Sequence, residues 1–309
     1  MTPADRDPYA YIDLARRGRT GLWVGLRGFG RIVLYVLAGM VVGGALVAAI
    51  IVWNPDGRAM LDRLSKGEAG PVPEFAAVLL QSVVVFWAVR DATVRTQRRP
   101  LMTLIAGTGR FDLRQALVGA VAMLAALLGA GLLASAVAGL LGIGTDAPPV
   151  WHWPDANWFV ALVLGAVIIP LQAGGEELLF RGWLTQTLGQ GIRNRLALTL
   201  LVGLLFALAH GVAPGAIAYF TVLSLSLSAV TLKAARLEPA IGAHVAQNLF
   251  VLLVVTPLLD GGEPTLLGSR SGELGAMAVV AALLQAGLFY GLATAPAFQR
   301  LFGARAARS

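Results

Sequence analysis

The sequence predicts an all-α fold, a polytopic membrane bundle of about eight transmembrane helices. Of its 309 residues, 57% are hydrophobic and only 13% are charged. The mean hydropathy of +0.74 lies far above that of ordinary soluble proteins. Apolar runs also recur along the chain at the length of roughly 20 residues that a helix needs to cross a bilayer. These observations together indicate a multispanning membrane protein.

Eight apolar segments are candidate transmembrane helices. In chain order they are residues 32–53, 75–89, 116–143, 158–184, 195–210, 216–232, 240–255 and 274–293. The second segment is short, so it could be tilted, re-entrant or extended back over Glu74. The fourth is longer than one perpendicular crossing, and Pro170 within it predicts a tilt or a kink.

Lysine and arginine alternate between the connecting segments as the positive-inside rule requires. Six basic residues precede the first helix and six lie between the second and the third, whereas residues 144–157 and 211–215 contain none. We therefore expect a plasma-membrane protein with both termini in the cytoplasm. The formal net charge of +7 follows from this asymmetry and from attraction to anionic lipid heads, so no nucleic-acid partner is expected.

The chain is expected to have three parts. Residues 1–157 would hold an N-terminal cytoplasmic segment and the first three transmembrane helices, residues 158–255 a core with all the polar motifs, and residues 256–309 the last loop, the final helix and a cytoplasmic tail. Cysteine is absent, which excludes disulfides, thiolate catalysis and cysteine-ligated metal.

Three ionisable residues, Glu176, Glu177 and Arg181, lie within six positions of one apolar run. Each would cost roughly 2.5–3.5 kcal/mol near the centre of a membrane, so they require pairing or a function. Four residues correspond to about one helical turn, which allows Arg181 to pair with Glu177. We expect this pair to act as a structural clamp and to leave Glu176 as the candidate general base.

Two further pairs of residues share the same four-residue spacing. Phe206 precedes His210, and His244 precedes Asn248. This spacing places both members of a pair on one helix face, so three helices can direct polar groups at one point. His210 would orient a water or pass a proton to the leaving amine, and Phe206 would support it by packing. His244 and Asn248 could donate hydrogen bonds to a developing oxyanion.

Each motif also has a purely structural interpretation. A buried Glu–Arg pair can simply hold two helices together, His210 can cap its helix, and His244 with Asn248 can hydrogen-bond between helices. For the whole protein, a non-enzymatic membrane peptide-binding, immunity or scaffold protein is the main alternative, and a transporter with a proton relay is another. Inverted repeats would support transport, but the polar residues are confined to one half of the chain.

In this order, the motifs Glu-Glu-x-x-x-Arg, Phe-x-x-x-His and His-x-x-x-Asn resemble the CPBP intramembrane proteases. That family contains type II CAAX prenyl endopeptidases, also called Ras-converting enzymes, and bacteriocin-processing relatives. The resemblance implies an intramembrane endopeptidase that hydrolyses a peptide bond of a membrane-associated or C-terminally lipidated peptide or protein by glutamate-activated water. It implies catalytic roles for Glu176, His210, His244 and Asn248, with structural support from Glu177, Arg181 and Phe206. The expected partners are membrane lipids and such a peptide or protein substrate.

The sequence leaves metal dependence open. Glu176, His210 and His244 would form a two-histidine, one-carboxylate set that could hold zinc with an open position. However, the chain has no His-Glu-x-x-His helix, and a glutamate that ligates metal could not also be the base. We therefore favour a reaction without a metal cofactor and keep zinc as the alternative.

Overall fold

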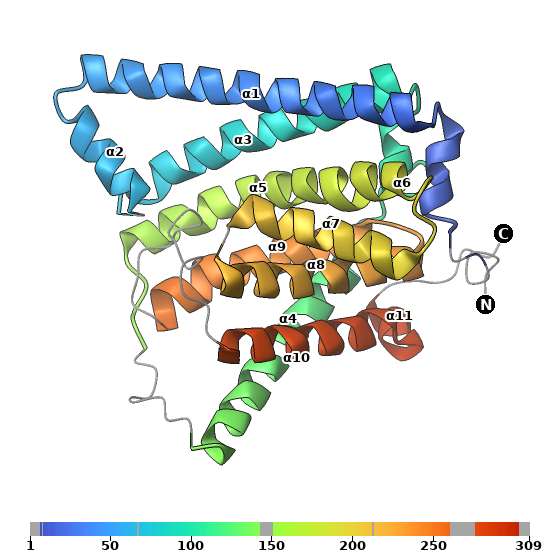
Figure 1. Ribbon diagram of the computed structural model, residues 1–309. Helices are drawn as coiled ribbons and strands as arrows, with labels where there is room; N and C mark the ends of the chain where they lie inside the picture. The colour runs from blue at the N-terminus through green and yellow to red at the C-terminus, as the bar shows by residue number, and fades with distance from the viewer. Residues whose placement is uncertain are drawn as a thin grey trace.

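The computed structural model describes residue 7 and residues 9–66, 68–142, 151–211, 213–259 and 276–302. These residues form a polytopic helical bundle with no β-sheet, and one isolated β-bridge joins Ala106 to Arg236 (Figure 1). The C-terminal tail and most of the last loop lie outside the described residues. The cytoplasmic location of both termini therefore stays a prediction.

All eight predicted segments are helical where they are described. The helices are α1 (Leu22–Trp53), α2 (Gly57–Ser65), α3 (Pro71–Asp91), α4 (Leu113–Leu140), α5 (Ala156–Glu177), α6 (Thr185–Leu188), α7 (Arg195–His210), α8 (Pro214–Ala234), α9 (Glu238–Phe250), α10 (Ala276–Thr294) and α11 (Pro296–Phe302). Short 3-10 helices cover Ile12–Arg17 and Leu101–Leu104, and π-helical turns cover Ala92–Thr96, Leu178–Leu184 and Val251–Leu259.

Seven helical stretches of the described chain are long and apolar enough to cross a membrane. One of them includes α3, which begins at Pro71 and so extends over Glu74, one of the options that the sequence left open. The one predicted segment that is too short is α7. Its 16 residues are only about 24 Å long, whereas the hydrocarbon core is about 30 Å thick. The expectation of eight helices of spanning length therefore holds for seven.

The central helices surround the polar motifs. Figure 1 shows α1 and α3 along one side of the bundle, and α5 packs between α3 and α9. On the other side, α4 packs on α9 and α10, and α8 packs on α7, α9 and α10. This arrangement brings together the faces of α5, α7 and α9 that carry the three motifs, while α5 and α7 each leave another face exposed.

Side-chain caps define where two of these helices begin. The carboxylate of Asp155 accepts a hydrogen bond from the backbone N–H of Trp158 at 2.9 Å, at the start of α5. The side-chain oxygen of Asn194 accepts one from the backbone N–H of Ala197 at 3.0 Å, at the start of α7. Such caps satisfy N–H groups that the first helical turn leaves free. They therefore stabilise the helices that carry the first two motifs.

Two glycines allow α4 and α9 to cross at backbone contact. A Cβ atom added to Gly119 would lie 1.8 Å from the carbonyl oxygen of Pro239, and one added to Gly242 would lie 1.8 Å from that of Ala116. Small residues permit this close approach between membrane helices. Because His244 follows Gly242 by two residues, the crossing determines where α9 presents its polar side chains.

We expect the substitution Gly119→Ala to lower stability by about 1–3 kcal/mol, because the added methyl group would displace the backbone of α9. Gly131→Ala is the matched control on the same helix, since nothing lies within 4 Å of its added Cβ atom. Thermal unfolding of both variants in detergent tests the expectation. Equal melting temperatures would contradict the close contact.

Candidate functional site

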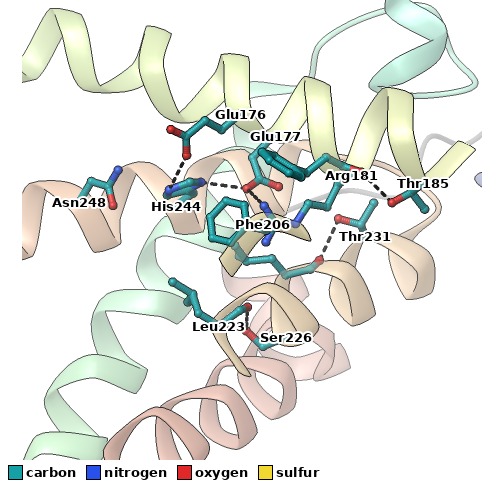
Figure 2. Close-up of polar contacts among 12 residues, drawn as sticks. Glu176, Glu177, Arg181, Thr185, Phe206, Leu223, Ser226, Thr231, His244 and Asn248 are labelled. Atoms are coloured by element: carbon teal, nitrogen blue, oxygen red, sulfur yellow. Dashed lines mark hydrogen bonds and ion pairs between the residues drawn. The ribbon is translucent and has the colours of Figure 1, made fainter. Parts of the chain in front are cut away.

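Residues from three helices and a π-helical turn meet in the interior of the bundle (Figure 2). Glu177 and Arg181 are fully buried at 0% exposure, Glu176 is 9% exposed, and His244 is 3% exposed. A charged group in such a place is costly unless it is paired and hydrogen-bonded. The arrangement of partners around each charge therefore decides what the site can do.

The clamp residue Glu177 holds together two elements. One of its oxygens, Oε1, accepts a hydrogen bond from Nη1 of Arg181 at 2.7 Å. The same oxygen lies 2.9 Å from Nδ1 of His244, across the α5–α9 interface. A carboxylate paired with a guanidinium is ionised and can only accept, so Nδ1 of His244 carries a hydrogen. The other ring nitrogen of His244, Nε2, is therefore the one that faces the remaining site.

The predicted base, Glu176, has one occupied and one free oxygen. Oε1 accepts a hydrogen bond from Nε2 of Gln172 at 2.5 Å. Oε2 lies 3.7 Å from Nε2 of His210 and 3.7 Å from Nε2 of His244, beyond direct hydrogen-bond distance. This buried oxygen has no hydrogen-bond partner among the described residues. Two imidazoles and a carboxylate thus converge without a direct hydrogen bond from either ring to the carboxylate.

His210 is held in one orientation by its backbone and by aromatic rings. Its Nδ1 lies 2.8 Å from the carbonyl oxygen of Phe206, which can only accept, so Nδ1 donates and Nε2 points toward Glu176. The imidazole packs against the rings of Phe206 and Phe220, with centroid distances of 4.2 and 4.6 Å. The guanidinium carbon of Arg181 lies 4.3 Å from the centroid of the Phe206 ring, so this ring packs against both Arg181 and His210.

Three ionisable side chains surround one point beside the Glu177–Arg181 pair. Oε2 of Glu176 lies 3.7 Å from Nε2 of His210 and 3.7 Å from Nε2 of His244. A carboxylate and two imidazoles at this separation are groups that can act in general acid–base catalysis.

Asn248 joins this cluster through a residue that the sequence analysis did not select. Its Nδ2 donates to Oε1 of Gln172 at 2.9 Å, and Gln172 in turn donates to Glu176. A signal for Gln172 was present, since it precedes Glu176 by four residues and so lies one turn away on the same helix face. Phe220 had no comparable signal, because it is one of many apolar residues in α8.

Glu176, His210 and His244, the three residues that could hold zinc, are not arranged as metal ligands in this structure. Glu176, His210 and His244 converge on one carboxylate oxygen. Yet no group of three histidine, cysteine, aspartate or glutamate side chains within the described part of the chain is arranged to hold a metal ion.

The segment that carries the site is similar to known proteins. Residues 154–250 match the family described as Type II CAAX prenyl endopeptidase Rce1-like, and this segment contains all four predicted catalytic residues. Uncharacterized protein YyaK of Bacillus subtilis (strain 168) is 27% identical over 253 residues, which cover 78% of this chain and 80% of that protein. No solved structure matches the chain significantly. The resemblance to type II CAAX prenyl endopeptidases that the three motifs predicted is confirmed for residues 154–250.

We expect Arg181→Ala to cost about 3–5 kcal/mol of stability, because it leaves the charge of Glu177 buried without its main partner. Lys66→Ala is the matched control, since Lys66 also pairs with a residue four positions earlier, Asp62 at 2.7 Å, but both of these side chains are more than half exposed. Exposed pairs contribute about 1 kcal/mol or less. If both variants had the same melting temperature and yield, the buried pair would not be the structural clamp.

Proposed function

We propose that this chain, whose residues 154–250 match the Rce1-like type II CAAX prenyl endopeptidases, is an intramembrane endopeptidase that uses glutamate-activated water. Its substrate would be a membrane-associated or C-terminally lipidated peptide or protein. One observation carries the proposal: the buried Oε2 of Glu176, with no hydrogen-bond partner among the described residues, faces the Nε2 atoms of two histidines at 3.7 Å. We place the enzyme in the plasma membrane with both termini in the cytoplasm.

Glu176 would act as the general base. A water near Oε2 gives a proton to this carboxylate while its oxygen forms a bond to the carbonyl carbon of the substrate. His210 is suited to assist, because its Nε2 faces the same oxygen and its ring is held by Phe206 and Phe220. The proton can then pass through His210 to the nitrogen of the leaving amine as the C–N bond breaks.

His244 and Asn248 would stabilise the oxyanion. For His244 to donate from Nε2, its ring must be protonated, since Nδ1 already donates to Glu177. Glu177, whose Oε1 accepts from Nδ1 of the same ring, would stabilise that protonated form. Asn248 uses one amide hydrogen on Gln172 and keeps the second for the oxyanion. Fixed donors of this kind stabilise charge that develops in the transition state.

The substitution Glu176→Gln should keep the fold and lower activity by at least about 100-fold, because it retains the shape of the side chain but cannot accept the proton. Glu68→Gln, at an exposed position of a connecting segment, is the control. Mass spectrometry of membrane peptides from cells with each variant would identify cleavage products that depend on Glu176. Identical peptide profiles in all cells would favour the non-enzymatic peptide-binding, immunity or scaffold alternative.

Metal dependence has its own test. If Glu176 is a free base, purified protein should contain no stoichiometric zinc and should keep its activity after prolonged chelation. Loss of activity on chelation with recovery on added zinc would instead make Glu176, His210 and His244 ligands. Near-equimolar zinc that disappears together with activity in His244→Ala would overturn the metal-free proposal.

A further inference from the structure

Gln172 connects two groups to which the proposed reaction gives different tasks. It lies on α5, one turn before Glu176, and its side chain is half-buried. Its Nε2 donates to Oε1 of Glu176 at 2.5 Å, and its Oε1 accepts from Nδ2 of Asn248 on α9 at 2.9 Å. One amide thus joins the candidate base to the candidate oxyanion donor.

The donor and acceptor roles along this bridge follow from the residues at its two ends, Glu176 and Asn248. An ionised carboxylate can only accept hydrogen bonds, so the NH₂ group of Gln172 must face Glu176. Its carbonyl oxygen then faces Asn248 and requires a donor there, which only the NH₂ group of Asn248 supplies. The chain of donors therefore runs one way, from Asn248 through Gln172 to Glu176, and it sets the amide orientation of Asn248.

The bridge complements the bond between Glu177 and His244. Both links cross the interface between α5 and α9, and both involve an acidic residue of the adjacent pair Glu176 and Glu177. With Oε1 of Glu176 held by Gln172, Oε2 is directed at the two histidines. Without Gln172, both the carboxylate of Glu176 and the amide of Asn248 would be free to rotate.

We propose that Gln172 is a positioning residue that aligns the base Glu176 with the oxyanion donor Asn248. This inference rests on the proposed function. Gln172 does not react itself. It fixes the position of Glu176, which activates the water, relative to Asn248, which binds the carbonyl oxygen of the substrate. Misplacement of a reacting group by about 1 Å can cost on the order of 100-fold in rate, so a residue in this role affects catalysis more than substrate binding.

The first test is Gln172→Met, which keeps the length of the side chain and removes both hydrogen bonds. Using a panel of internally quenched peptides, prenylated and unprenylated, we expect kcat to fall about 100-fold with little change in KM. Gln299→Met is the matched control, since Gln299 on α11 donates its side-chain hydrogen bond to the carbonyl oxygen of Ala293 on α10, far along the chain from the site. Melting temperatures show whether each variant is folded.

A second variant separates positioning from packing. In Gln172→Glu, a protonated carboxyl can still donate to Glu176 and accept from Asn248, whereas an ionised one would repel Glu176. Its activity relative to the wild type should therefore rise toward acidic pH and fall toward alkaline pH. His210, His244 and the Glu177–Arg181 pair surround the site in both proteins, so the ratio of the two pH profiles removes their contributions.

A double substitution completes the test. If Gln172 and Asn248 act together, the variant with both Gln172→Met and Asn248→Ala should lose less activity than the product of the two single losses. Full activity of folded Gln172→Met, losses that multiply in the double variant, or a pH profile of Gln172→Glu that parallels the wild type would each overturn the inference. Cleavage by the wild type but not by Glu176→Gln would then still support the proposed function. Absence of any Glu176-dependent cleavage would overturn both.

Discussion

The fully buried carboxylate of Glu177 is the group around which the functional half of this protein is arranged. Its Oε1 accepts hydrogen bonds from Arg181 on the turn that follows α5 and from His244 on α9. Removing one partner from a buried ion pair leaves a charge in a low-dielectric interior. The bond from His244 therefore joins α9 to α5, and Arg181 balances the charge of Glu177. The acid–base chemistry that we propose for Glu176 depends on this balance.

Backbone contacts elsewhere in the bundle position the site residues around Glu177. Gly119 and Gly242 let α4 and α9 touch, and this determines where α9 presents His244 and Asn248. The π-helical turn Leu178–Leu184 begins directly after Glu177, and π-helical insertions often occur at functional sites. Arg181 lies within this turn and still reaches the carboxylate one turn back. Helix packing and a local change of helical geometry thus act together on a few side chains.

The shortness of α7 has a consequence for access to the site. His210 is the last residue of α7, and its side chain is 24% exposed, compared with 11% for Glu176 and 3% for His244. A longer helix would continue past this imidazole. Of these three side chains, that of His210, the residue that we propose to exchange protons with the substrate, is therefore the most exposed. The aromatic rings of Phe206 and Phe220 keep this more exposed imidazole in a defined orientation.

The sequence by itself determined the fold class, the helical segments and the three motifs, because hydrophobic length and one-turn spacing are local properties of a chain. It also predicted that Glu177 and Arg181 would meet, since both lie on one helix face. Tertiary structure decided the rest. The bond of His244 to Glu177, the ring of Phe220 beside His210 and the bridge of Gln172 to Asn248 join residues on different helices. Their meeting depends on how the helices cross and rotate against each other, and spacing within one helix carries no information on that.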